Sequence, residues 1–448
     1  MSSTSHNRRI PSPRGISTIT VSGFKSLVEE KKIEIRPLTV LAGTNSSGKS
    51  SILQPILMLK QTLDATYDPG VLLLYGPNVK FTSTEQMFSK LIGKSSVGIF
   101  TIEVMLEKEG SIKQVFRKRQ KKGLELVEFT YTNGSNNLSL NQDMTTEAIE
   151  AILPEYLKEL EKSLAKHGRA ALNWSVERNR CFLTVGLNAS RLPTGIKTSL
   201  AFPSVEEFAS HIRRIIHVPG LRGNPERTYK TTAIGTEFPG TFETYVASVI
   251  HHWQTIKSEK LRELGSSLEA LGLTWKVEAR QIDDTQVELR VGRLPHGVKS
   301  GARDTVNITD VGFGVSQTLP VLVALLLAER GQLVYIEQPE IHLHPRAQGA
   351  MAQILADAAL RGVKVVVETH SSLLLRGIQT VISKGVLPKE LVKLHWFTRK
   401  LEDGTTEIAS TDLDENGAFG EWPVDFDEVI LDSEKQYLDS VELKGFFS

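Results

Sequence analysis

The pattern of hydrophobic and polar positions divides the chain into an α/β beginning, a mixed middle and an α/β end. The unbroken apolar run Leu38–Ala42 is typical of a strand buried on both faces of a parallel sheet, and a helix is expected after it, from about Ser50 to Leu63. Alternation over residues 97–106 and 112–117 predicts a hairpin, which residues 123–140 would extend into an antiparallel sheet.

Shorter signals complete the expected order of elements. Pro154 lies near an early turn of a charged, helical stretch, and proline and glycine mark residues 218–229 as a loop. The other expected elements are strands near 17–21 and 33–35, helical structure over 145–171, β structure over 173–200, helices over 241–256 and 259–271, a hairpin over 275–279 and 287–291, a strand at 333–336, a helix over 345–359, a strand at 363–368 and, from residue 393, a strand pair turning at 403–404.

This order predicts an α/β fold with a mixed central sheet, an antiparallel β lobe and a partly helical insertion. The expected division of the chain is a flexible tail over 1–16, the two halves of one domain over 17–140 and 301–448, and a mixed helical and β insertion over 141–300.

Composition narrows the class of protein. Hydrophobic residues make up 40% and charged residues 23% of the 448 residues, which is an ordinary globular balance. Lys and Arg total 53 against 52 Asp and Glu, so the net charge gives no indication of a nucleic-acid partner. Cys181 is the single cysteine, which excludes a disulfide or a cysteine-based zinc site within one chain. The single cysteine fits a reducing cytoplasm, and no apolar run reaches the ~18 residues of a membrane span, so we expect a soluble, cytoplasmic protein.

The strongest chemical signal follows the buried strand at 38–42. The eight residues after it match the phosphate-binding loop pattern G-x-x-x-x-G-K-[ST] at every constrained position, and Ser51 follows them. In such a loop, backbone N–H groups and the N-terminus of the next helix face phosphate oxygens. Lys49 is expected to reach the β- and γ-phosphates of ATP, and the Ser50 hydroxyl to bind Mg²⁺. The expected cofactor-binding residues are Gly43, Thr44, Asn45, Ser46, Ser47, Gly48, Lys49, Ser50 and Ser51.

Three weaker signals in the last third support the same site. An apolar strand ends at Glu337, where open α/β sheets bind their ligands, so Glu337 is expected to hold Mg²⁺ through water. His370 follows the next strand, and a neutral imidazole there can hydrogen-bond the γ-phosphate. Gly314 and Ser316 open a very apolar helix, with Ser316 as its expected N-cap; a capped core helix without a functional role is the alternative interpretation.

In this order, the motifs resemble those of ABC-type ATPase heads. The opening "ITVSGFKSL…IEIRPLTVLAGTNSSGKSSIL" is similar to the SMC/RecF/OLD group. "VYIEQPEIHLHPRAQ" and "THSSLLL" resemble bacterial AAA-type ATPases of the OLD-like group, which includes ATPase subunits of anti-phage modules of the Septu and PARIS types. The resemblance is strong over residues 17–60 and 305–375. It implies a P-loop ATPase head that forms a homodimer or higher oligomer, with ATP between two heads and Gly314 and Ser316 acting on the γ-phosphate held by the other head.

Two departures from that family pattern concern hydrolysis. ABC heads usually carry Asp-Glu at the strand end, with the glutamate as general base, whereas this chain has Glu337-Gln338, and a neutral amide cannot take a proton from water. Glu340 is the alternative base, or else it caps the next turn. The glutamine that many heads place between their lobes is not obvious, with Gln54 and Gln86 as candidates. The expected catalytic set is therefore Glu337, Gln338, Glu340 and His370.

Two other patterns have simpler explanations. Asp412–Gly417 matches the first half of a calcium-binding loop, but Pro423 stands where the bidentate glutamate is required, so a turn is expected. His342 and His344 lack a clear third metal ligand.

The 78 residues after His370 are too few to complete the sheet and add a nuclease domain.

We therefore expect a slow ATPase without nuclease activity. It would act as a nucleotide-dependent switch or scaffold for an effector protein from a neighbouring gene, in anti-phage defence. One alternative is a DNA-repair or chromosome ATPase that acts directly on duplex DNA. The other is an ATP-bound scaffold that hardly hydrolyses.

Overall fold

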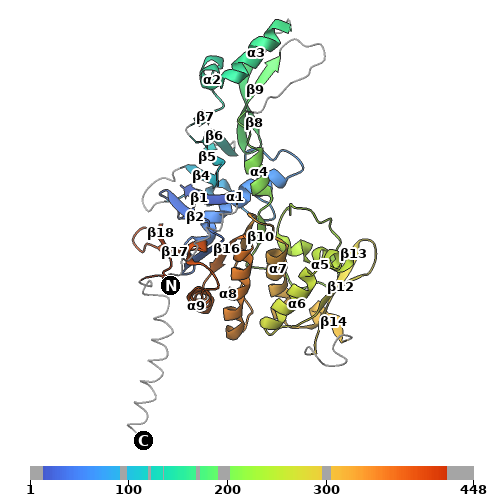
Figure 1. Ribbon diagram of the computed structural model, residues 1–448. Coiled ribbons are helices and arrows are strands. Elements are labelled where there is room, and N and C mark those ends of the chain that lie inside the picture. The colour runs from blue at the N-terminus through green and yellow to red at the C-terminus, as the bar shows by residue number, and fades with distance from the viewer. Residues whose placement is uncertain are drawn as a thin grey trace, which may run out of the picture.

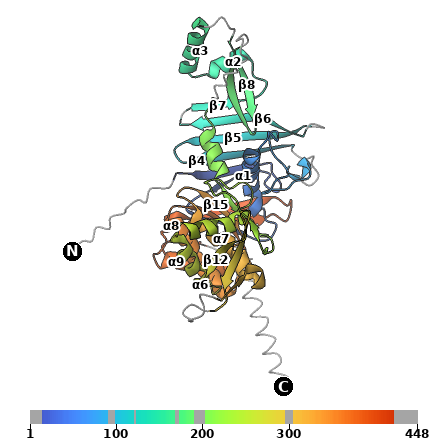
Figure 2. The ribbon, with the colours of Figure 1, turned by 90° about the vertical axis from the view of Figure 1, so that its right-hand side faces the viewer.

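A computed structural model describes residues 14–90, 98–119, 123–134, 136–167, 172–189, 202–294 and 304–420. Most of the expected tail over 1–16, and the β structure expected over 190–200, lie outside these residues. The molecule is elongated, with a narrow arm above a broader body (Figures 1 and 2). In the described part of the chain, no helix is long and apolar enough to cross a membrane.

A six-stranded mixed sheet forms the centre of the body and confirms the predicted fold class. Its first five strands are parallel and the last is antiparallel. In spatial order they are β10 (Ile216–Val218), β15 (Leu333–Glu337), β16 (Lys364–Thr369), β3 (Leu38–Gly43), β17 (Val392–Arg399) and β18 (Thr406–Thr411). The strand predicted at 38–42 is therefore central, and all six residues of β3 are buried.

The two faces of this sheet belong to two hydrophobic cores, because side chains alternate along each strand. Val366 of β16 packs in the core that contains α1, whereas its neighbours Val365 and Val367 pack in the core of the opposite face. The helices are α1 (Lys49–Asp64) on the first side, and α7 (Phe313–Leu327), α8 (Pro345–Leu360) and α9 (Ser372–Ser383) on the second. The helices predicted over 50–63 and 345–359 are confirmed.

An antiparallel sheet forms the lobe beside α1. It contains the predicted hairpin, now β4 and β5, and all of its strand pairs are antiparallel. Its spatial order is β2 (Lys31–Glu34), β1 (Ile16–Ser22), β4 (Ile99–Leu106), β5 (Gly110–Arg119), β6 (Gly123–Asn133) and β7 (Asn136–Leu140).

Residues 141–300 contribute to three parts of the molecule. The arm consists of α2 (Thr146–Ile152), α3 (Glu155–His167), β8 (Leu172–Asn179) and β9 (Phe182–Ala189), with α4 (Glu206–Arg213) leading back to the body. Pro154 lies between the two helices of the arm. The chain then enters the central sheet as β10. It continues beside α7 as β11 (Tyr229–Lys230), η2 (Phe242–Tyr245), α5 (Val246–Thr255), α6 (Lys260–Ala270), β12 (Val277–Gln281) and β13 (Gln286–Gly292), which β14 (Thr305–Asn307) joins.

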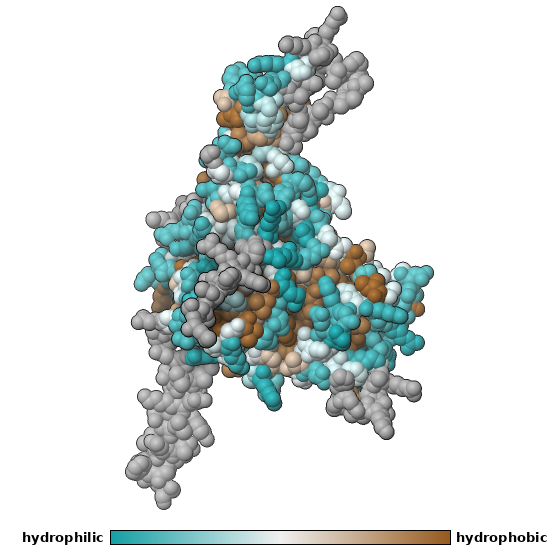
Figure 3. Space-filling view, viewed as in Figure 1, coloured by the Kyte–Doolittle hydropathy of each residue, from teal (hydrophilic) through white to brown (hydrophobic). Residues whose placement is uncertain are grey.

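Three short 3-10 turns connect these elements, namely η1 (Thr84–Gln86), η3 (Ile308–Asp310) and η4 (Lys389–Leu391). On the face in Figure 3, hydrophobic side chains gather over the body, in the region where Figure 1 places α7 and α8.

Candidate functional site

The loop between β3 and α1 is shaped to receive an anion. Gly48 precedes the helix with φ 99°, and no side chain caps the first turn. A Cβ on Gly43 would lie 2.2 Å from the Phe397 carbonyl oxygen, and one on Gly48 would lie 2.5 Å from Thr406 Oγ1, so both positions require glycine. Thr406 belongs to β18, and its hydroxyl donates to the Ser47 carbonyl oxygen at 2.7 Å and lies 2.8 Å from Ser26 Oγ. The helix N-terminus is therefore left open toward the adjoining pocket.

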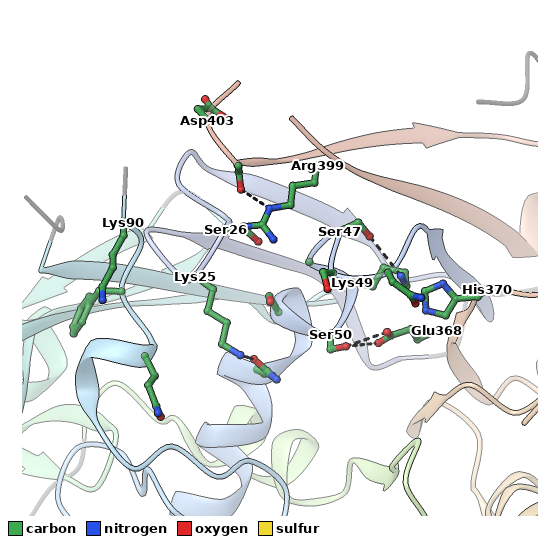
Figure 4. Close-up of a pocket in the computed structure, with 18 of the residues that line it drawn as sticks. Lys25, Ser26, Ser47, Lys49, Ser50, Lys90, Glu368, His370, Arg399 and Asp403 are labelled. Atoms are coloured by element: carbon green, nitrogen blue, oxygen red, sulfur yellow. Dashed lines mark hydrogen bonds between the residues drawn. The ribbon is translucent and has the colours of Figure 1, made fainter. Parts of the chain in front are cut away.

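This pocket has a volume of about 800 Å³ and lies along the P-loop (Figure 4). Seven of the nine P-loop residues expected to bind the cofactor, Asn45 to Ser51, line it. Gly43 and Thr44 do not line it, and their carbonyl oxygens accept hydrogen bonds from Lys49. The other lining residues are Lys25, Ser26, Gln54, Glu85, Gln86, Phe88, Lys90, Gln338, Glu368, His370, Arg399, Asp403 and Gly404.

Lys49 is held by the loop that precedes it. Its Nζ donates to Gly43 O at 3.1 Å and Thr44 O at 2.7 Å, and it lies 3.5 Å from Ser47 Oγ. Burial lowers the pKa of the Lys49 ammonium to about 8, although the charges of Glu368 and Glu340 act to raise it. This ammonium is therefore desolvated before any phosphate approaches it.

Ser50 is paired with a carboxylate that sequence reasoning missed. Its hydroxyl lies 3.0 Å from Oε1 and 2.8 Å from Oε2 of Glu368, at the end of β16. Burial, and then the nearby charge of Glu337, raise the pKa of Glu368. The available signal was an acidic residue that ends an otherwise apolar strand, directly before Thr369 and His370.

Glu337, expected beside Mg²⁺, has other partners. His217 Nε2 lies 3.2 Å from its Oε1, and the Gly220 N–H donates to its Oε2 at 3.0 Å. Burial acts to raise the pKa of Glu337, but these hydrogen bonds and the charge of His217 leave it below its usual value. Glu337 lies on β15, so β16 separates it from the P-loop strand.

The other predicted catalytic residues do gather at this edge of the sheet. Gln338 lines the pocket and has φ 46°, and its N–H donates to the Glu368 carbonyl oxygen at 2.7 Å. Glu340 Oε1 accepts from Thr369 Oγ1 at 2.7 Å and from the His370 N–H at 3.0 Å. The Glu340 side chain thus binds the end of β16, and α8 is capped by His344 instead.

The protonation of two of these groups suits a reaction with water. Burial raises the pKa of Glu340, and its Oε2 is buried without a hydrogen-bond partner. Burial and the charge of Lys49 lower the pKa of His370 below its usual value, although a hydrogen bond with the Gly43 backbone acts in the other direction. At pH 7 the His370 imidazole is therefore neutral.

The helix that Gly314 and Ser316 were expected to open differs from the prediction at its first residue. Gly312, with an extended backbone, is the N-cap of α7, so the expected N-cap role of Ser316 is wrong. Ser316 lies in the first turn, where its Oγ donates to Phe313 O at 3.1 Å. It lines a second pocket of about 470 Å³, and a Cβ on Gly314 would meet Leu273. Neither Gly314 nor Ser316 lines the P-loop pocket of the same chain.

Arg222 connects this helix to the end of β15. It comes from the loop 218–229, to which the sequence assigned no chemistry, and is only 7% exposed. One guanidinium nitrogen donates to Gln317 O at 3.1 Å, and the other lies 2.7 Å from Glu337 O and 3.3 Å from Gln338 O. Burial lowers the pKa of Arg222 to about 10, so it stays charged at neutral pH.

Both glutamine candidates line the pocket, with different partners. Gln54 Oε1, on α1, accepts from Lys25 Nζ at 2.6 Å. The Gln86 amide is bonded to Thr82 through both its oxygen and its nitrogen. Gln54 lies on α1, the same helix as Ser50, whereas Gln86 lies in η1.

The two patterns set aside from the sequence have structural roles. Asp414 accepts N–H groups of Asn416 and Ala418, both at 2.8 Å, and forms the predicted turn; Pro423 lies outside the described residues. His344 Nδ1 accepts from the Arg346 N–H at the start of α8. Within the described residues, no three His, Cys, Asp or Glu side chains are grouped for metal binding.

Comparison with known proteins places these residues inside one family match. The profile of the family described as "AAA domain, putative AbiEii toxin, Type IV TA system" matches residues 38–376, about three quarters of the chain. This span begins with β3, ends in α9 and contains the P-loop, Glu337, Glu368 and His370. No protein with a curated description matches the chain.

Solved structures similar to this chain include three SMC heads. An SMC head bound to the C-winged helix domain of ScpA is 11% identical with a TM-score of 0.45, covering 90% of this chain and 98% of that one. The SMC head domain from Thermotoga maritima is 12% identical with a TM-score of 0.38, covering 89% and 100%. The Smc head with an extended coiled coil bound to the C-terminal domain of ScpA, derived from Pyrococcus furiosus, is 11% identical with a TM-score of 0.42, covering 96% and 100%.

Proposed function

The chain belongs to the AAA domain family whose description names an AbiEii toxin of a type IV toxin–antitoxin system, and on that premise we propose that it is a slow, ATP-driven switch. The observation that carries the proposal is the P-loop pocket. There the Lys49 ammonium, the Ser50 hydroxyl and the neutral His370 imidazole meet the end of a strand that carries Glu368.

Binding follows from the open start of α1. The triphosphate of ATP would lie against the N–H groups of the P-loop, and Lys49 would exchange its backbone carbonyl partners for β- and γ-phosphate oxygens. The site also fits Mg²⁺, because the Ser50 hydroxyl and the Glu368 carboxylate beside it are hard oxygen donors of the kind that this ion prefers, and Glu337 ends the next strand. Bound Mg²⁺ would neutralise charge on the phosphates and orient them.

Hydrolysis needs a group that accepts a proton from water. Gln338 lies in the pocket but its amide is not a base. We assign the role to Glu340, whose Oε1 is fixed by Thr369 and His370 while its buried Oε2 has no partner. His370 would hydrogen-bond the γ-phosphate. Because the base stands two residues beyond the usual position, turnover should be slow and the ATP state should persist.

A second copy of the chain would complete the site. Ser316 lines a different pocket from the P-loop, and Gly314 does not line the P-loop pocket either, so within one chain they do not meet the phosphates. In a homodimer with ATP at the interface, they would contact the γ-phosphate held by the partner. Formation and decay of this dimer would be the switch that controls an effector protein. We propose that the switch acts in defence against phage; the family description names a putative toxin of a type IV toxin–antitoxin system.

One observation favours a second candidate, an ATP-bound scaffold without turnover. Gln338 occupies the position next to Glu337 where a catalytic carboxylate would stand. The scaffold would hold its effector for as long as ATP stays bound. Measured hydrolysis in a single turnover separates the two functions, and stimulation of that hydrolysis by duplex DNA would instead favour a DNA-repair or chromosome ATPase.

The first test is nucleotide affinity. Lys49→Ala should bind ATP far more weakly, because the β- and γ-phosphates lose their nearest cation. Lys389→Ala is the matched control, since Lys389 is a lysine paired with Glu415 on the surface. Isothermal titration of both folded variants decides the matter, and parent-like affinity in Lys49→Ala would overturn the P-loop assignment.

The second test concerns the composite site. Ser316→Arg would place a bulky side chain in the proposed interface, so this variant and Lys49→Ala should each be inactive alone. Each mixed dimer has one site with an intact Lys49 from one chain and an intact Ser316 from the other, so random 1:1 mixing should restore about a quarter of the parent activity. Full activity of Ser316→Arg alone, or no recovery on mixing, would contradict the arrangement.

A further inference from the structure

The contact between Ser50 and Glu368 has the spacing of two neighbouring metal ligands. The Ser50 hydroxyl oxygen lies 3.0 and 2.8 Å from the two oxygens of the Glu368 carboxylate, and the side chains meet within the pocket (Figure 4). Adjacent ligands of an octahedral Mg²⁺, each about 2.0–2.1 Å from the ion, lie roughly 2.9 Å apart. The two side chains therefore have the separation that this ion requires of them.

Strand order explains why Glu368 reaches this place. β16 lies directly beside β3, with Glu368 opposite Leu41 and Thr369 opposite Ala42. Glu337 is opposite Glu368 on the next strand, β15, and is therefore one strand spacing, about 4.8 Å, further from the P-loop. The carboxylate nearest the P-loop serine is the one on β16.

Fixed donors keep the two carboxylates apart. Tyr335 is fully buried, and its hydroxyl donates to Glu368 Oε2 at 2.9 Å. The Tyr335 ring stacks on His217 at 5.3 Å between centroids, and His217 in turn contacts Glu337. The Gly220 N–H donates a hydrogen bond to Oε2 of Glu337. Glu337 is thus hydrogen-bonded to His217 and Gly220, whereas Glu368 contacts Ser50.

Two like charges on neighbouring buried strands need a nearby cation. Burying carboxylates is costly unless each is paired or coordinates a metal. Lys49 supplies one positive charge near Glu368, but in the proposed function it is engaged by phosphate. A divalent cation at Ser50 would then neutralise Glu368, while the charge of Arg222 stays near Glu337.

We propose that Glu368, and not Glu337, is the carboxylate that binds Mg²⁺ together with Ser50. This rests on the proposed function, since the ion arrives with ATP. Glu337 then has an outer role and orients the site through His217 and Gly220. The sequence favoured Glu337, at the end of β15, as the Mg²⁺ residue, whereas the proposed ligand, Glu368, is on β16.

The test is the effect of Mg²⁺ on nucleotide affinity, which does not depend on turnover. An ATP analogue with a non-hydrolysable β–γ bridge is titrated into parent, Glu368→Gln and Glu337→Gln proteins, each with Mg²⁺ and with a chelator. Loss of an outer partner of a metal ligand typically weakens metal affinity by about 10–100-fold, and loss of the ligand itself should cost more. Glu368→Gln should therefore lose most of the Mg²⁺-dependent gain, and its loss should exceed that of Glu337→Gln. Its affinity in chelator should not fall.

A spectroscopic readout makes the test independent of nucleotide affinity. Mn²⁺ replaces Mg²⁺ at oxygen sites, and its paramagnetic resonance reports free and bound ion directly during titration of the protein with analogue. Mn²⁺ affinity should drop in Glu368→Gln and stay closer to the parent in Glu337→Gln. If Glu368→Gln does not fold, Glu368→Asp withdraws the carboxylate by one methylene and should show the same loss.

Equal losses in the two glutamine variants, a loss confined to Glu337→Gln, or no loss in either would each overturn the assignment. The proposed function fails separately. Parent-like affinity of Lys49→Ala for ATP would remove the P-loop site altogether. A second outcome would refute only the role of Glu368. In that case Lys49→Ala binds ATP weakly, as the P-loop assignment requires, but Mg²⁺ raises the nucleotide affinity of Glu368→Gln as much as that of the parent.

Discussion

ATP affinity should fall steeply between pH 7 and pH 9 because of the position of one ammonium group. Lys49 is 3% exposed, and its burial lowers its pKa to about 8 against the opposing effects of Glu368 and Glu340. The ordinary lysine value is near 10.5, so most lysines keep their charge throughout this range. Lys49 loses its charge just above neutral pH.

The size of the effect follows from the proton balance. Bound triphosphate favours charged Lys49, so above pH 8 the protein must take up a proton as ATP binds. Below pH 8 the ammonium is already protonated and the dissociation constant should be nearly constant. Above pH 8 the constant should rise up to tenfold per pH unit, which gives about a tenfold loss of affinity from pH 7 to pH 9, or roughly 1.4 kcal/mol.

Calorimetric titration in buffers of different ionisation enthalpy measures both the dissociation constant of ATP and the number of protons taken up on binding. Proton uptake on binding should be about 0.5 at pH 8 and about 0.9 at pH 9. In Lys49→Arg, whose guanidinium stays protonated, any remaining affinity should not change with pH. Burial also lowers the pKa of Lys25 in the same pocket, so Lys25→Gln is the second control and should keep the slope. His370, with its pKa below the ordinary value, does not titrate here. Constant affinity from pH 7 to pH 9 without proton uptake would refute the reasoning.

The remaining predictions concern turnover and the chain's own activity. Glu340→Gln should keep ATP binding and lose about 10²–10⁴-fold in single-turnover hydrolysis, whereas Gln338→Glu should hydrolyse faster; parent-like hydrolysis by the first would mean that the water is activated elsewhere. Arg222→Lys cannot reach three carbonyl oxygens, so turnover should slow while ATP affinity is kept. Equal slowing in Arg361→Lys, which loses only the hydrogen bond to Leu325 O at the far end of α7, would assign the effect to general packing. The purified chain should leave DNA and RNA intact in Mg²⁺, and cleavage abolished by mutating its own acidic residues would contradict this.

Local sequence signals were sufficient for much of the fold. The apolar run at 38–42 and the P-loop after it predicted β3 and α1, because burial on both faces and phosphate-loop geometry are both properties of contiguous residues. Boundaries were less certain, as the strand expected from Trp275 begins at Val277. The role of β10 could not be predicted, since three residues before a proline and glycine loop carry no information about pairing with β15.

The candidate site shows the same division. Residues within the P-loop were found because their spacing is fixed along the chain. Glu368 was missed because its contact with Ser50 depends on strand order, which brings residues 318 positions apart together. The N-cap of α7 is Gly312 because the helix starts at Phe313, three residues before Ser316. A buried arginine such as Arg222 has no local signal at all.

The position of β3 has a consequence for the order in which the protein can be made. Both neighbours of β3 in the sheet, β16 and β17, come from the last quarter of the chain, and the Thr406 hydroxyl supports the P-loop at Ser47. At roughly 5–20 residues per second, β17 leaves the ribosome roughly 20–70 s after β3. The P-loop strand has no partner on either side until β16 leaves the ribosome, and only that one partner until β17 follows. A nascent chain stalled before residue 392 should therefore be unable to retain ATP, because its P-loop then lacks both β17 and the support of the Thr406 hydroxyl at Ser47.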